Sequence, residues 1–209
     1  MASFDDDSYP DTTDYFARAW ETAQKFPEAA VISAASPGLE RETPGFMRIA
    51  VYSGCGCVFR RSWLLKTPGF VPLPIAYGME EADISLQLHA MNGLIVHDPH
   101  LHVRHDHPLG ESRDVGSWNA TILANTMLLP WLRYPFWLLP AGLAQVANRI
   151  IWMIRHRHVQ GLLRGLGMVP TYLWQHRRFR KVLPAAKVGS WFRLRRRPCR
   201  LDGENTVAA

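Results

Sequence analysis

Three consecutive aspartates form a dense group of carboxylates near the start of the chain. Asp5, Asp6 and Asp7 directly follow the apolar Phe4, an order typical of a strand that runs into a loop. Carboxylate oxygens are the ligands that Mg²⁺ and Mn²⁺ prefer, and a metal held by them can also bind the oxygens of a diphosphate. A solvated acidic segment that caps the next helix is the alternative interpretation.

A second group of carboxylates lies in the first turn of a predicted helix. Glu80, Glu81 and Asp83 crowd into four positions, ahead of the apolar residues of that helix. Crowded carboxylates are a common source of a general base for proton abstraction. Acidic residues also stabilise a helix N-terminus simply through the helix dipole. Both interpretations stay open.

Five histidines lie within the eleven positions 97–107, so zinc must be considered. The spacing of His100, His102 and His105 nearly meets the zinc pattern H-x-H-x-D-H. Arg104 stands where that pattern has its aspartate, and a cation there argues against zinc. Strand alternation also separates His100 and His102 from His105, so only some of these imidazoles are expected to share a metal.

The cysteines do not form a metal-binding or disulfide framework in the sequence. Cys55 and Cys57 lie in a Gly-Cys-Gly-Cys segment that permits close backbone approach, and Cys199 has no second thiol near it in sequence. We therefore expect reduced structural thiols and a cytoplasmic location.

Helices and strands alternate over the first half of the chain. Helices are predicted over 12–25, 58–66 and 80–91, and strands up to Phe4 and over 29–35, 47–52, 94–96 and 101–103. Asp11 is predicted to cap the first helix. This alternation indicates an α/β fold over residues 1–112. Residues 113–201 are predicted to be helical, with the helices broken at five prolines: Pro130, Pro135, Pro140, Pro170 and Pro184. Residues 202–209 are predicted to be a disordered tail.

Charge divides the 209-residue chain more sharply than its net value of +6 suggests. Residues 1–114 carry 9 Lys/Arg and 16 Asp/Glu, whereas residues 115–201 carry 15 Lys/Arg and no acidic residue. An acidic half suits a divalent metal, and a basic half suits phosphate on a membrane, a nucleic acid or a nucleotide.

The basic half mixes aromatic residues with cations, as amphipathic helices that lie on membranes do. Its uncharged runs, 115–132 and 134–148, are interrupted by Arg133, and neither reaches the roughly 20 apolar residues that a membrane span needs. A span formed by both runs together, with Arg133 buried, is the less favoured alternative. We therefore expect peripheral attachment to an anionic membrane surface. Nucleic-acid binding is the less favoured alternative, through the basic segments 177–181 and 193–200 and the aromatic residues Trp174, Phe179, Trp191 and Phe192.

The order of the motifs is more specific than any one of them. The chain reads Phe4-Asp5-Asp6-Asp7-Ser8-Tyr9-Pro10, then Gly54-Cys55-Gly56-Cys57-Val58-Phe59-Arg60-Arg61-Ser62, then Tyr77-Gly78-Met79-Glu80-Glu81-Ala82-Asp83, then Val103-Arg104-His105. This series resembles the family 2 inverting glycosyltransferases of the GT-A fold, a Rossmann-like sheet domain, over residues 1–107. The helical remainder is similar, more loosely, to the extension of bacterial members that glycosylate envelope polysaccharides.

The resemblance implies a role for each matching residue. Asp5 and Asp7, with Asp6 between them, match the carboxylates that bind Mg²⁺ or Mn²⁺ together with a nucleotide diphosphate sugar. His105 matches a further metal ligand. Glu81, preceded by Glu80, matches the base that deprotonates the acceptor hydroxyl. The backbone that borders the donor and acceptor sugars is matched by Gly54, Cys55 and Gly56.

The expected function is therefore metal-dependent sugar transfer with inversion, from a nucleotide diphosphate sugar to a glycan or lipid-linked acceptor, at the inner face of the plasma membrane. Family members carry further βαβ units before the acidic strand end, whereas four residues precede Asp5 here. The expectation from this difference is a partial catalytic domain with little or no activity alone. The alternative function is a non-enzymatic module that binds membranes through its basic helices.

Overall fold

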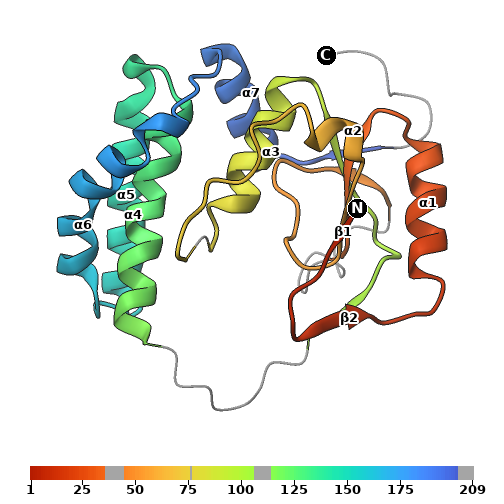
Figure 1. The fold of residues 1–209 in the computed structure, drawn as a ribbon, viewed down its shortest axis with the longest axis horizontal. Coiled ribbons are helices and arrows are strands. Elements are labelled where there is room, and N and C mark those ends of the chain that lie inside the picture. The colour runs from red at the N-terminus through yellow and green to blue at the C-terminus, as the bar shows by residue number, and fades with distance from the viewer. Residues whose placement is uncertain (36–44, 76, 106–113, 202–209) are drawn as a thin grey trace. The chain divides into compact units, whose positions relative to one another are not determined.

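The computed structural model describes residues 1–35, 45–75, 77–105 and 114–201 (Figure 1). These described residues fall into two compact units. The first is formed by those within Met1–Gly69, Ile84–Pro108 and Gly189–Ala209, and the second by those within Phe70–Asp83 and Leu109–Val188. The described part of the first unit contains strands and helices, and that of the second is helical. The predicted α/β class is therefore confirmed, while the predicted disordered tail lies outside the described residues.

A six-stranded mixed sheet forms the centre of the first unit, in the order β1-β5-β3-β6-β4-β8. Its strands are β1 (Ala2–Ser3), β3 (Ala29–Ser33), β4 (Met47–Arg48), β5 (Cys57–Phe59), β6 (Leu94–His97) and β8 (Cys199–Arg200). Only β3 and β6 are parallel among the described neighbours; the other pairs are antiparallel. A separate antiparallel pair joins β2 (Ser8–Pro10) to β7 (Val103–His105).

Helices cover both faces of this sheet, which explains why β3 lacks an alternation of apolar and polar residues over Ala29–Ile32. Ile32 of β3 belongs to the core under α1 (Tyr15–Lys25), together with Tyr15. Val31 belongs to the core on the opposite face, together with Ile84 of α3 (Glu80–Ala90). Since successive strand residues point to opposite faces, a strand buried on both sides is expected to be mostly apolar rather than alternating. Figure 1 shows α1 and α3 on opposite sides of the strands.

Four predicted elements differ in the structure. Of the strand predicted over 47–52, only β4 is formed. The segment 58–66 is not one helix: β5 pairs with β3 and uses its first residues, and only α2 (Arg61–Leu64) is helical. Helix α1 begins at Tyr15 rather than Thr12, and the backbone N–H of Asp11 instead donates to the carbonyl of His102 (3.1 Å). The last predicted strand lies two residues later, at β7, because its partner β2 determines where pairing starts.

The end of the described chain returns to the first unit. In α7 (Ala185–Arg196), the indole N–H of the buried Trp191 donates to the carbonyl of Ala50 (2.8 Å), and Ser190 Oγ lies 2.8 Å from His89 Nε2. Strand β8 then pairs with β4. The sequence-based division placed these residues in the helical extension, whereas their contacts group them with the sheet.

The second unit is built on α4 (Val115–Arg133), which packs with α5 (Leu139–Arg155) and α6 (Leu162–Gln175). Two short 3₁₀ turns, Phe136–Leu138 and Arg177–Phe179, follow α4 and α6. The three helices share one core, whose buried members are Leu123, Met127, Val146 and Met153.

Glycines let these helices approach one another closely, and two prolines lie inside helices rather than at their ends. A Cβ on Gly165 of α6 would lie 2.8 Å from the carbonyl oxygen of Ala120, and one on Gly142 of α5 would lie 2.5 Å from Pro130. Pro130 and Pro170 lie inside α4 and α6, so the prediction that they break helices is wrong. For Pro130, burial against α5 offsets the backbone hydrogen bond that a proline removes.

None of the helices in the described ranges is both long and apolar enough to cross a membrane.

Candidate functional site

The candidate site of the first unit lies at one edge of its sheet. Strand β1 is antiparallel to β5, and β5 is antiparallel to β3, so β1 runs in the same direction as β3 and β6. The carboxyl ends of these three strands therefore lie at the same edge. Open α/β sheets bind ligands outside this edge.

The aspartate trio lies on a tight turn that leaves β1 at this edge. The backbone N–H of Ser8 donates to the carbonyl of Asp5 (3.1 Å), and the Ser8 hydroxyl donates to the same oxygen (3.0 Å). Asp5 and Asp6 are exposed and Asp7 is half-buried. The loop that the sequence predicted here is confirmed as this turn.

Strand pairing brings His105 next to this turn. In the β2–β7 pair, Ser8 lies opposite His105 and Tyr9 lies opposite Arg104. The backbones of Asp7 and His105, which are about a hundred positions apart in the sequence, are thus one residue from direct register. Two parts of the metal site implied by the resemblance therefore lie side by side at the level of the backbone.

The Gly54-Cys55-Gly56 turn lies at the same edge, because β5 starts where β1 ends. The backbone N–H of Gly56 donates to the carbonyl of Ser3 (2.8 Å). Gly56 has φ +74°, and a Cβ there would lie 2.1 Å from Val103 Cγ2 of β7. The turn therefore touches both the strand that precedes the aspartates and the strand that carries His105.

A buried tyrosine holds this turn in place. The Tyr15 hydroxyl, on α1, donates to the carbonyl of Gly56. Burial raises the pKa of Tyr15, and the nearby thiols of Cys57 and Cys55 and the carboxyl of Asp98 raise it further. The phenol therefore keeps its proton and goes on donating throughout the physiological pH range. Sequence reasoning did not identify Tyr15, although its place in the buried stripe of α1 marks it as a core residue.

Asp98 organises the histidine-rich segment. Its carboxylate accepts from the hydroxyl of Thr22 (2.5 Å) and from the backbone N–H of His100 (2.9 Å), and its own N–H donates to the carbonyl of Ser33 (3.0 Å). Its buried carboxylate thus fixes the loop between β6 and β7. Among the residues that the structure describes, no group of three His, Cys, Asp or Glu side chains is placed to hold a metal.

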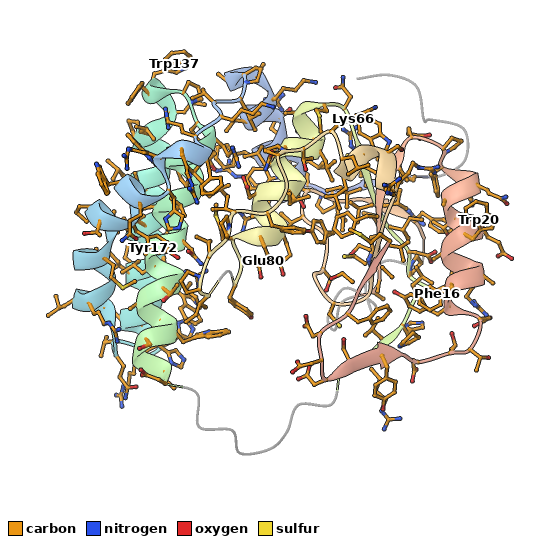
Figure 2. All side chains as sticks on the ribbon, in the orientation of Figure 1. Phe16, Trp20, Lys66, Glu80, Trp137 and Tyr172 are labelled. Carbon is orange, nitrogen blue, oxygen red and sulfur yellow. The ribbon has the colours of Figure 1, made fainter. Side chains whose placement is uncertain are left out.

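The two glutamates singled out from the sequence belong to the second unit. Glu80 and Glu81 are half-buried in the first turn of α3, where Glu80 Oε2 accepts the backbone N–H of Met79 (3.1 Å). Figure 2 labels Glu80 at this end of the helix.

Asp83, the third acid of this turn, forms a buried ion pair that the sequence did not predict. Its Oδ1 accepts from Nε of Arg133 (2.5 Å), and its Oδ2 accepts from Nη2 (2.8 Å). Arg133 also donates through Nη1 to the carbonyl of Phe179 (2.9 Å). A lone arginine between two uncharged runs was the available signal, because a buried cation requires an acidic partner. Asp83 therefore anchors the start of α3 to α4.

The site residues are thus placed in two groups. The aspartate turn, the Gly54-Cys55-Gly56 turn and the backbone of His105 belong to the first unit, and Glu80 and Glu81 belong to the second.

Comparison of the chain with protein-family models, with curated proteins and with solved structures found no match.

Proposed function

We propose that the chain acts in metal-dependent sugar transfer, in which a sugar passes with inversion from a nucleotide diphosphate sugar to a hydroxyl of a glycan or lipid-linked acceptor. One observation carries the proposal: the aspartate turn, the Gly54–Gly56 turn and the backbone of His105 meet at the carboxyl edge of β1 and β3. The GT-A form of the α/β fold is part of this proposal, supported by the motif order and by that edge.

The donor set suits Mg²⁺ or Mn²⁺. Asp5 and Asp7 would hold the metal, with Asp6 beside them and His105 on the paired strand. Mg²⁺ commonly takes one or two carboxylates and completes its shell with water and substrate phosphate, rather than using a closed protein cage. An exposed turn of carboxylates fits a metal that is bound together with a diphosphate. When bound, the metal would stabilise the negative charge that develops on the departing nucleoside diphosphate.

The remaining steps belong to side chains and backbone of the chain. Glu81 is the proposed base: its carboxylate takes the proton of the acceptor hydroxyl as that oxygen bonds to the anomeric carbon. The bond from this carbon to the diphosphate oxygen breaks as the new bond forms, and the diphosphate leaves with the electron pair. A single displacement of this kind inverts the configuration and needs one base. Glu80 and the Gly54-Cys55-Gly56 turn are proposed to border the sugars.

We expect the double substitution Asp5→Asn with Asp7→Asn to lower the affinity of the chain for Mn²⁺ by at least about tenfold, a loss of roughly 1.4 kcal/mol or more in binding free energy. The amide oxygens that remain are neutral and bind hard cations weakly. The measurement is a Mn²⁺ titration followed by water-proton relaxation.

Asp11→Asn with Asp14→Asn is the matched control, since both carboxylates are exposed in the same N-terminal segment and the net charge changes equally. The control is expected to keep the affinity of the unsubstituted chain. Equal losses in both variants would show that Mn²⁺ responds only to total charge and would contradict the proposed metal site.

A second candidate function, membrane binding without catalysis, is favoured by one observation in the second unit. Its helices α5 and α6 expose large apolar side chains in a region without acidic residues. The expected partner is the anionic inner face of the plasma membrane, and vesicle binding would then survive Asp7→Ala and Glu81→Ala. Nucleic acid fits less well, since Trp191 is fully buried and cannot stack on a base.

A further inference from the structure

Helix α5 carries two apolar stripes, of which only one is used by the fold. Val146 and Met153 lie on the inner stripe and belong to the core shared with α4. A second stripe is formed by residues spaced four, four and three positions apart, all of them exposed: Leu143, Ala147, Ile151 and Ile154. At 100° per residue, these four positions fall within an arc of about 80°.

Helix α6 repeats this arrangement. Tyr172 is buried on its inner face (Figure 2), and Val169 and Leu173 pack against the shared core. The outer stripe again spans about 80° of the helix surface and consists of Leu163, Leu166, Pro170 and Trp174. Leu163 is 82% exposed and Trp174 is 64% exposed.

Outer stripes of this kind do not help the three helices to pack. A helix on the surface of a soluble bundle normally shows one apolar stripe toward the core and polar residues on the other side. Contiguous exposed apolar residues instead mark surfaces that bind a partner or a membrane. The outer faces of α5 and α6 therefore require a partner that is itself apolar.

The charges around these stripes specify the partner further. The segment 139–180 contains no acidic residue and seven arginines, namely Arg149, Arg155, Arg157, Arg164, Arg177, Arg178 and Arg180. The guanidinium of Arg177 lies 4.0 Å from the centre of the Trp174 ring, at the end of the α6 stripe. Arg155 is exposed and lies next to the α5 stripe, one residue after Ile154. Apolar stripes bordered by arginine and tryptophan are typical of helices that lie in the interface of an anionic bilayer.

We propose that the outer faces of α5 and α6 bind the surface of a bilayer that contains anionic lipid, with both helices lying in the plane of the membrane. The leucine and isoleucine side chains enter the boundary of the acyl chains, and the arginines contact lipid phosphates. A nucleic acid would satisfy the arginines but leave Leu163 and Ile154 in water. The inference deepens the membrane part of the proposed function and does not depend on sugar transfer.

The test is co-sedimentation of the full chain with phosphatidylcholine vesicles, with and without phosphatidylglycerol. Two triple variants remove one stripe each: Leu143→Gln, Ile151→Gln and Ile154→Gln on α5, and Leu163→Gln, Leu166→Gln and Trp174→Gln on α6. Each variant is expected to lower binding to the anionic vesicles by at least about tenfold, because three large apolar side chains no longer leave water. Added salt should weaken binding of the unsubstituted chain, since it screens the arginines.

A triple variant on the first unit is the matched control: Phe16→Gln, Trp20→Gln and Leu65→Gln. These side chains are also large and exposed, Trp20 to 65%, and Figure 2 shows Phe16 and Trp20 on α1. The control should bind vesicles as the unsubstituted chain does. Circular dichroism and thermal unfolding verify that all three variants are folded.

Three results would overturn the inference: unchanged binding of both stripe variants, an equal loss in the control, or binding of duplex DNA without binding of vesicles. The variant with Asp5→Asn and Asp7→Asn separates this inference from sugar transfer, because it should bind vesicles normally. Equal losses of Mn²⁺ affinity in this variant and in the control with Asp11→Asn and Asp14→Asn, together with intact vesicle binding, would therefore count against the metal site alone.

Discussion

Replacing Arg133 by methionine is expected to lower the free energy of unfolding by about 3 to 5 kcal/mol. The Arg133 and Asp83 side chains are 1% and 2% exposed, and the guanidinium donates to both carboxylate oxygens and to the carbonyl of Phe179. Without the guanidinium, the carboxyl of Asp83 would lose its hydrogen-bond donors in a site that water does not reach. Urea denaturation followed by helical circular dichroism measures the loss.

Two further variants show whether the cost comes from the unpaired charge. Arg133→Met combined with Asp83→Leu should recover most of the stability, because an apolar pair of similar volume often replaces a buried ion pair at little cost. The pair Arg18–Asp14 has a similar N···O distance, 2.6 Å, but is 46% and 48% exposed. Arg18→Met should therefore leave stability nearly unchanged, since water screens the pair. A small loss for Arg133→Met, equal to that for Arg18→Met, would contradict the buried ion pair.

Gly56→Ala is expected to cost about 2 to 5 kcal/mol of stability. The positive φ of +74° costs an alanine roughly 1–2 kcal/mol. The new Cβ would also meet Val103 Cγ2 at 2.1 Å and the Tyr15 hydroxyl at 3.0 Å, and overpacking of this kind typically costs about 1–3 kcal/mol more. Thermal and urea unfolding of the purified variant measure the total.

Gly69→Ala isolates the conformational part of this cost. Gly69 has a φ of +81°, but a Cβ there has nothing within 4 Å. Its alanine variant should lose only the roughly 1–2 kcal/mol of the left-handed conformation. Equal losses at both positions would show that the Gly56 turn does not pack against β7, and the close approach at the candidate site would then be wrong.

The elements that sequence reasoning predicted well are those with a pattern of their own. The apolar run at 29–35 and the acidic start and Asn92-Gly93 end of the helix at 80–91 carry local signals, and β3 and α3 lie there. Strands β2 and β8 have three and two residues, too few for any periodicity. Their existence depends on β7 and β4, which lie far away in the sequence. Only tertiary packing determines such strands.

The residues of the candidate site were likewise predictable only where they belong to a local motif. The motif order pointed to the aspartates, to the Gly54–Gly56 turn and to His105, and the sheet gives a physical reason for their backbones to meet. Tyr15 and Arg133 were not assigned roles, because their partners Gly56 and Asp83 lie 41 and 50 positions away. Single-sequence patterns identify side chains that can do chemistry more readily than those that hold them in place.

The position of bound Mn²⁺ tests the central claim most directly. In spectra of the isotope-labelled chain, Mn²⁺ should broaden the backbone amide signals of Asp5, Asp6, Asp7 and His105 at low occupancy. Those of Cys199 and Arg200 should stay sharp, since β8 lies at the opposite end of the six-stranded sheet from β1, about 24 Å away at the usual strand spacing. Broadening that spares the aspartate turn, or that reaches β8 equally, would contradict a metal site at this edge.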